Sequence, residues 1–177
     1  MSDGAGVEVV ERSTGTHGDA TATFDPTRTY RYRLARTWDP TGPVVAFVML
    51  NPSTADAEVL DPTVRRCVGF ARAWEFGSLE VVNLFAFRAT DPRDLLRADA
   101  PVGPANDRAI LDAVSVADRV VVAWGARGTH LGRAAAVTGL LRAGPVRPLA
   151  LATTKDGQPR HPLYLRADTR PSRWSAN

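Results

Sequence analysis

The sequence predicts an α/β fold: a three-layer α/β/α arrangement around a four-stranded parallel central sheet in the order 2-1-3-4. Two observations carry this prediction. Four short apolar segments, at residues 44–50, 79–85, 119–124 and 147–152, are typical of buried strands. Helical patterns separate these segments, and strands that alternate with helices form right-handed crossovers within a parallel sheet.

The first of these strands, at residues 44–50, organises the rest of the chain. The run VVAFVML is uninterrupted, contains β-branched and aromatic residues, and is closed by Asn51-Pro52. It therefore predicts a strand buried on both faces, ended by a proline that cannot continue the ladder. Ligands of open α/β sheets bind at the carboxyl ends of the strands. Asn51 is accordingly the first candidate for chemistry.

The N-terminal part of the chain is expected to contribute less to the core. Residues 1–22 are small and polar and predict a disordered tail, so that residues 23–177 form a single α/β domain. Residues 27–38 alternate aromatic and basic side chains, which indicates a half-exposed strand. With the turn at residues 39–43 it predicts an antiparallel hairpin with the first buried strand, and places Arg31, Arg33 and Arg36 on a solvated face.

Helices are expected at four places. Asp61-Pro62 resembles an N-cap followed by proline at the first helical position, and apolar residues recur at helical spacing to residue 74. Residues 94–98, 104–116 and 131–141 show further helical patterns. Asp56 and Asp61 are interpreted as ordinary capping carboxylates.

Composition narrows the class of protein. The chain has 177 residues, of which 44% are hydrophobic and 23% charged, and no apolar run approaches the roughly 20 residues that span a bilayer. Neither a secretory signal nor a cysteine pair is visible, since Cys67 is single. We expect a cytoplasmic monomer that does not contact membranes. The sequence pI of 9.6 and an excess of arginine permit nucleic-acid binding.

Polar or glycine-containing segments follow each predicted strand, and in a parallel sheet these ends share one edge. Taken singly, each signal has a simpler explanation as a cap, a turn or core packing. Together they predict one concave site. The candidates for catalysis are Asn51 and His161, and those for substrate binding are Pro52, Ser53, Thr54, Asn83, Arg88, Trp124, Gly125, Lys155, Arg160, Leu163 and Tyr164.

Several catalytic templates do not match. The single cysteine and three histidines lack zinc-site spacing, no dinucleotide or Walker A glycine motif is present, and Ser53 lacks a nucleophile elbow. No metal or cofactor is therefore expected. An amide offers one donor and one acceptor group, the pattern that complements a pyrimidine edge, and an imidazole can stabilise an oxygen that gains negative charge.

Over residues 30–174 the sequence resembles an uncharacterised bacterial family of unknown function. The motifs that carry this resemblance are LNPSTAD, DPTVRRC, VVNLFAFRATDP, AWG and TKDGQPRHPLYL. The family's name implies no activity.

More distantly, the strand-end motifs are similar to those of the uracil-DNA glycosylase superfamily, which implies a glycosylase-like fold. Asn51-Pro52 matches the start of an Asn-Pro-Gly motif, and His161-Pro162 the start of a His-Pro-Ser motif. The resemblance implies that Asn51 orients water, Asn83 reads a flipped base, and His161 stabilises the departing base. Residues 163–165 would form the wedge loop. Ser53 and Leu163 depart from the two motifs, and a single cysteine excludes the iron–sulfur branch.

The expected function is hydrolysis of an N-glycosidic bond in nucleic acid, or recognition of a base or nucleotide, in a cleft formed by Asn51, Asn83, Arg88 and His161. DNA or a nucleotide is the expected ligand. Two alternatives stay open: an enzyme that acts on a free nucleoside or another small molecule, and a non-catalytic nucleotide- or nucleic-acid-binding module.

Overall fold

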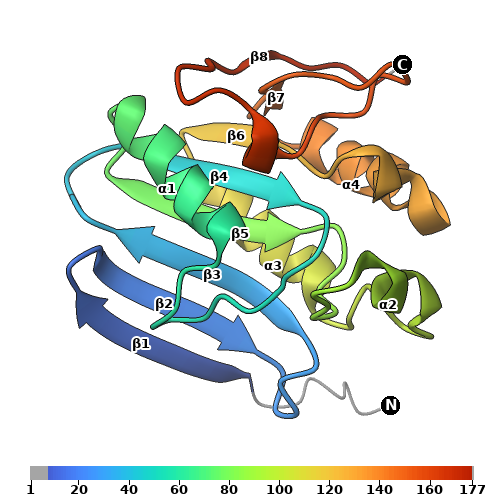
Figure 1. The fold of residues 1–177 in the computed structure, drawn as a ribbon, viewed down its shortest axis with the longest axis horizontal. Helices are drawn as coiled ribbons and strands as arrows, with labels where there is room; N and C mark the ends of the chain where they lie inside the picture. The colour runs from blue at the N-terminus through green and yellow to red at the C-terminus, as the bar shows by residue number, and fades with distance from the viewer. Residues whose placement is uncertain (1–7, 177) are drawn as a thin grey trace.

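The computed structural model describes residues 8–176, in which eight strands form one mixed sheet with helices on both faces (Figure 1). The strand order is β1-β2-β3-β5-β4-β6-β7-β8. The strands are β1 (Val9–Gly15), β2 (Gly18–Phe24), β3 (Arg31–Thr37), β4 (Val44–Met49), β5 (Ser78–Asn83), β6 (Arg119–Val122), β7 (Leu149–Ala150) and β8 (Ser172–Arg173).

The predicted fold class was wrong. The sheet has eight strands instead of four, and antiparallel pairs outnumber parallel ones. Neighbours β1–β2, β2–β3, β3–β5 and β7–β8 run antiparallel, while β5–β4, β4–β6 and β6–β7 run parallel. A four-stranded parallel sheet of the glycosylase type therefore does not describe this protein.

Most of the expected N-terminal tail is part of the sheet. Residues 9–15 and 18–24 form β1 and β2, and only residues 1–7 of the predicted tail lie outside the described residues. Strand β2 buries Ala20, Ala22 and Phe24 on one face and alternates them with polar residues. This is the period of a half-buried strand, but two of the three buried side chains are alanines. Their small size hides the alternation in the sequence.

The predicted hairpin between residues 27–38 and 44–50 is also wrong, because β5 lies between β3 and β4. The connection at residues 39–43 crosses the start of β5 instead of turning back beside β3. At the crossing, Gly77 accepts hydrogen bonds from Trp38 N–H and Asp39 N–H, each at 3.0 Å, and donates one to Pro43 O at 2.8 Å. Two backbone segments thus meet at Gly77 with no space for a side chain.

We expect Gly77→Ala to lower the free energy of unfolding by about 1–3 kcal/mol. The new methyl would overlap the carbonyl oxygen of Asp39 and lie 2.8 Å from Cα of Gly42. Both are backbone atoms, so relieving the overlap would require a shift of the main chain. Gly69→Ala is the matched control: Gly69 lies exposed within a helix, and a methyl group added there would meet no atom of another segment within 4 Å. It should raise stability by about 0.5–1 kcal/mol. Urea unfolding measures both, and equal effects would contradict the close crossing.

Helices lie close to their predicted positions. Their bounds are α1 (Pro62–Ala73), α2 (Pro92–Arg97), α3 (Asn106–Ser115) and α4 (Arg133–Arg142), with short 3₁₀ turns η1 (Ala126–Gly132) and η2 (Pro162–Tyr164). Asp61 caps α1 as expected, because its side chain accepts a hydrogen bond from Val64 N–H at 2.8 Å. Local capping chemistry therefore predicts where this helix begins.

Strand β4 is buried on both faces, as its uninterrupted apolar run predicts. Val45, Phe47 and Met49 join the core beneath α1, whereas Ala46 and Val48 join the core beneath α3 and α4. Within the sheet, Met49 on β4 pairs in parallel register with Asn83 on β5. The carboxyl ends of these two strands consequently lie side by side, and the candidate site begins there.

Candidate functional site

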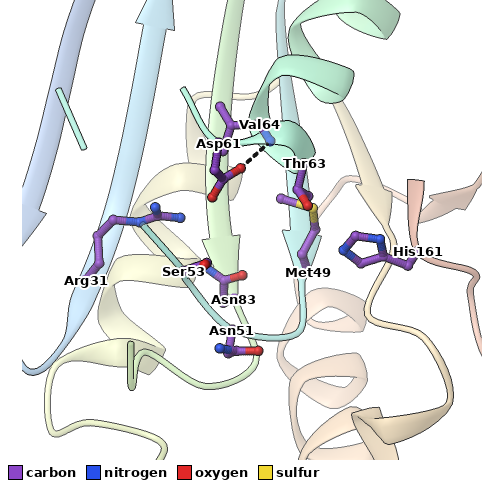
Figure 2. A pocket seen from close by; sticks show the side chains of 9 residues that line it. All are labelled: Arg31, Met49, Asn51, Ser53, Asp61, Thr63, Val64, Asn83 and His161. Carbon is purple, nitrogen blue, oxygen red and sulfur yellow. Dashed lines mark hydrogen bonds between the residues drawn. The ribbon is translucent and has the colours of Figure 1, made fainter. Parts of the chain in front are cut away.

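A small cavity, here called the pit, lies at the carboxyl ends of β4 and β5 (Figure 2). Its volume is about 40 Å³, and it is lined by Arg31, Met49, Asn51, Ser53, Asp61, Thr63, Val64, Asn83 and His161. One water needs roughly 10–15 Å³ by this measure. The pit can hold a few waters or the edge of a ligand, but not a whole nucleobase.

A larger cavity of about 880 Å³, here called the cleft, adjoins the pit. Asn51, Ser53, Thr63 and His161 line both cavities and connect them. The other residues that line the cleft are Leu50, Ala89, Thr90, Pro92, Trp124, Gly125, Ala126, Arg127, Leu163 and Tyr164. A ligand whose ring rests in this cleft can extend a polar edge into the pit.

Asn83 is the most unusual residue of the pit. It ends β5, is 1% exposed, and neither its Nδ2 nor its Oδ1 has a hydrogen-bond partner among the described residues. Figure 2 shows its amide among the side chains that line the pit. A buried polar group without a partner costs about 1–3 kcal/mol. Both polar atoms of the Asn83 amide are therefore available to a water or a ligand in the pit.

Asn51 joins two loops. Its Nδ2 donates to the carbonyl of Pro52 at 3.0 Å and to the carbonyl of Ala89 at 2.9 Å, so it ties the loop after β4 to the loop after β5. Both of its donor hydrogens are used in these bonds. Its Oδ1 is left as an acceptor for a water or a ligand.

His161 approaches the pit from the far end of the chain, and its Nδ1 accepts a hydrogen bond from Leu163 N–H at 3.3 Å. In the neutral ring the proton is therefore on Nε2, which is free to donate. Burial lowers the pKa of His161, and the negative charge of Asp61 partly opposes this effect. The imidazole is thus a neutral hydrogen-bond donor at neutral pH.

The lowered pKa of His161 predicts a pH dependence of stability. The unfolded chain binds the proton more readily, so stability is lost as the pH falls through the ordinary value of about 6.5 towards the folded value. We expect the wild type to lose more free energy of unfolding than His161→Asn between about pH 7.5 and about pH 5. Urea unfolding at several pH values measures the difference. Parallel curves would show that burial does not affect this imidazole.

Sequence reasoning missed the burial of two arginines of β3, of which Arg31 lines the pit. Arg31 was assigned to a solvated face, but it is 2% exposed and donates from Nη1 to Ala55 O at 2.7 Å. Burial lowers its pKa to about 10, with the charge of Asp61 acting in the opposite direction. Arg36 is also buried. Strand β3 lies inside the sheet instead of at its edge, and this position buries both arginines.

Asp61 was interpreted as a helix cap only, but the structure also places it in the lining of the pit. It is 7% exposed, and its carboxylate lines the pit as well as capping α1. A helix that follows a parallel strand starts at the edge where the strand ends. This rule could have placed Asp61 beside Asn51.

The remaining predicted residues divide into two groups. Ser53, Trp124, Gly125, Leu163 and Tyr164 line the cleft, whereas Pro52, Thr54, Arg88, Lys155 and Arg160 line neither cavity. Arg88, which was expected to form part of the cleft, lies outside both cavities. Its guanidinium lies 5.1 Å from the ring centroid of Phe24, and its Nε lies 3.5 Å from Ser53 O. Arg88 therefore supports the Ser53 loop from outside.

Trp124 and Gly125 form a rigid wall of the cleft. Trp124 is 1% exposed, donates from Nε1 to Gln158 Oε1 at 2.9 Å, and meets Trp174 edge-on with ring centroids 5.3 Å apart. Gly125 has φ = 74° and donates to Pro159 O at 2.7 Å. Strand β6 is thereby linked to the loop that carries His161.

A buried polar network supports the end of β5 from the opposite side. Asn106 Nδ2 donates to the carbonyls of Asn83 and Leu84, each at 3.0 Å, and Arg133 Nε donates to Leu84 O at 2.8 Å. Arg133 also pairs with Asp107 at 2.5 Å. The backbone of β5 is held by α3 and α4, which leaves the side chain of Asn83 to the pit. Neither supporting residue was identified from the sequence.

The described residues contain no cluster of three or more His, Cys, Asp or Glu that could hold a metal ion. Nor does any helix within residues 8–176 have the length and apolar composition to cross a membrane.

The fold and site together define an α/β protein with a mixed sheet and a polar pit at the ends of its parallel strands. Comparison with known families gives a more particular assignment. The chain belongs to DUF1643, described as a protein of unknown function, and the match covers residues 31–163. No curated protein and no solved structure matches the chain.

Proposed function

We propose that this protein recognises a nucleobase and hydrolyses its N-glycosidic bond in nucleic acid. The observation that carries the proposal is Asn83, whose donor and acceptor are both buried without partners beside Asn51 and His161. A carboxamide complements an edge that carries one acceptor and one donor, as the imide edge of a pyrimidine does. The motif resemblance to glycosylases supports the same chemistry.

In the proposed reaction the base lies in the cleft, and its polar edge reaches Asn83. The C–N bond breaks, and its electron pair leaves with the base. His161 Nε2–H donates to the base oxygen that gains negative charge, and such a preorganised donor stabilises the transition state more than the ground state. The oxygen of a water oriented by Asn51 then bonds to the sugar carbon, and the proton that this water loses balances the one that the departed base takes up.

A nucleic-acid strand suits the rim of the cleft. Tyr164 lines the cleft yet is 87% exposed, and Arg127 lines the same cavity. An exposed aromatic side chain can stack on a base, and arginine can pair with phosphate. Leu163 and Tyr164 are therefore the wedge candidates.

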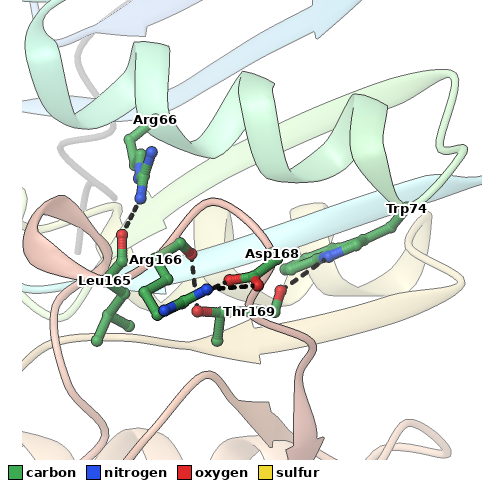
Figure 3. Close-up of polar contacts among 6 residues, drawn as sticks. All are labelled: Arg66, Trp74, Leu165, Arg166, Asp168 and Thr169. Atoms are coloured by element: carbon green, nitrogen blue, oxygen red, sulfur yellow. Dashed lines mark hydrogen bonds and ion pairs between the residues drawn. The ribbon is translucent and has the colours of Figure 1, made fainter.

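Leu165 is the last residue of the segment 163–165, the wedge loop that the glycosylase resemblance implies. Its side chain packs against the core. It is half-buried, and its carbonyl accepts a hydrogen bond from Arg66 on α1 (Figure 3). Trp74 Nε1 also donates to Thr169 O at 3.2 Å, which holds the following segment against the same helix. These contacts anchor the base of the wedge loop and leave Tyr164 at its tip.

The direct test is an abasic-site cleavage assay. Single- and double-stranded oligonucleotides would carry uracil, hypoxanthine, mismatched or damaged bases, and alkali would reveal each released base as a strand break. Free nucleosides of the same bases would be incubated in parallel and assayed for released base by chromatography. We expect release of at least one base type by the wild type, and its loss in His161→Ala. Release from free nucleosides alone would favour the small-molecule alternative. No release from any of these compounds would overturn the proposal.

One observation favours the non-catalytic alternative. Both amide hydrogens of Asn51 are bound to carbonyls, and an amide cannot remove a proton from water as a carboxylate can. Calorimetric titration of the protein with nucleosides and oligonucleotides measures whether it binds them and so tests the binding-module alternative. Saturable binding with no base release after prolonged incubation would establish it.

A further inference from the structure

Asp61 carries the one carboxylate among the described residues that line the pit. Its Oδ1 accepts the capping hydrogen bond from Val64 N–H, and no described residue donates a hydrogen bond to its Oδ2. Figure 2 shows the second oxygen turned away from Val64, on the side of the pit where Arg31, Ser53 and Asn83 lie. One oxygen thus holds the helix, and the other is free for chemistry in the pit.

The charged groups around Asp61 face the same cavity. Its negative charge acts on both Arg31 and His161, which line the pit with it. Arg31 makes no ion pair within 4 Å with a described residue, although it is buried. Its positive charge balances the buried carboxylate from a distance and leaves Asp61 Oδ2 without a bonded partner.

The volume of the pit suits a water molecule next to Asp61. About 40 Å³ exceeds the space that one water needs. Ser53 and Thr63 offer hydroxyls to the same space, and Asn51 offers its Oδ1. A water there has several polar partners, which is the requirement for a well-ordered site.

We propose that Asp61 is the general base of this site, a role that rests on the proposed hydrolysis. Asp61 Oδ2 takes a proton from the water in the pit while the oxygen of that water bonds to the sugar carbon. The electron pair of the broken C–N bond leaves with the base, which takes up a proton from solvent afterwards. Asn51 then serves to orient the water, and its inability to accept a proton no longer conflicts with catalysis.

The test compares Asp61→Asn with the wild type on the oligonucleotides and nucleosides of the release assay. Asparagine caps helices as well as aspartate does, so α1 should still form. We expect kcat to fall by about 10²–10⁴-fold with little change in KM. Asp91→Asn is the matched control, because Asp91 also caps a helix, accepting a hydrogen bond from Arg93 N–H at the start of α2, and lines neither cavity. It should retain the activity of the wild type.

Chemical rescue separates proton transfer from a structural role. Asp61→Ser also keeps a capping oxygen but opens space in the pit, and added formate should restore part of its activity. This variant also provides the test if Asp61→Asn does not fold. An active wild type with an equally active Asp61→Asn would overturn the role of Asp61 and leave the proposed function standing. A wild type inactive on every substrate would overturn both.

Discussion

Asn83→Leu is expected to abolish base release without weakening the fold. The amide of Asn83 is buried with both polar atoms unpaired, so its replacement by an apolar side chain of the same branching removes a cost instead of a bond. The adjoining pit has room for the larger methyl groups. The free energy of unfolding should stay unchanged or rise by about 1–3 kcal/mol. Catalytic efficiency should fall by about 10⁴-fold, because recognition of the polar edge is lost.

Asn106→Leu is the matched control for this prediction. Asn106 is as deeply buried, but its amide donates to the carbonyls of Asn83 and Leu84. Its replacement should destabilise the protein by about 1–3 kcal/mol, since those acceptors lose a donor. Urea unfolding and the base-release assay on both variants give the comparison. If Asn83→Leu destabilised the fold as much as Asn106→Leu, the amide of Asn83 would have a structural partner, and its role as a ligand-reading group would be rejected.

His161→Ala is expected to lower kcat for base release by about 10²–10³-fold, the usual effect of removing one donor to a developing oxyanion. The effect should fall on kcat more than on KM, because the charge appears only as the C–N bond breaks. Single-turnover rates on the best substrate measure the chemical step directly.

His161→Asn separates chemistry from loop geometry. An asparagine can still accept the hydrogen bond that Nδ1 now takes from Leu163 N–H, so the turn before η2 should persist. It has no group in the place of Nε2–H. We expect His161→Asn to be as impaired as His161→Ala. Wild-type activity in the asparagine variant would mean that His161 only shapes the loop.

The elements that could be predicted depend on local chemistry. The apolar run of β4 predicts burial on both faces because every side chain in it avoids water, whatever the neighbouring strands are. The start of α1 is predictable because Asp61 and Pro62 satisfy the first turn from within a few residues. Such signals need no knowledge of the rest of the chain.

Topology could not be predicted in the same way. Strand β2 contributes Ala20 and Ala22 to the core, and such small side chains carry little periodic signal. The insertion of β5 between β3 and β4 depends on the crossing at Gly77, a contact between segments distant in the sequence. Period-two patterns predict strands but not which strands pair.

The candidate site shows the same division. Asn51, Asn83 and His161 follow apolar segments, and the structure brings all three to the pit. Arg31 and Asp61 also line it, although one resembled a solvated strand residue and the other a simple cap. Arg88 is likewise a polar residue that follows a predicted strand. Its guanidinium nevertheless lies over the ring of Phe24, outside the pit. Their functional roles stay predictions.

Hydrophobic runs and capping residues in the chain were sufficient to locate strands β4, β5, β6 and β7, the main helices and the polar residues that end these strands. The eight-stranded pairing, the burial of Arg31 and the unpaired state of Asn83 required the folded arrangement. The physical reason is range: backbone capping and side-chain burial act over a few residues, whereas a hydrogen-bond partner or its absence depends on every segment that packs nearby.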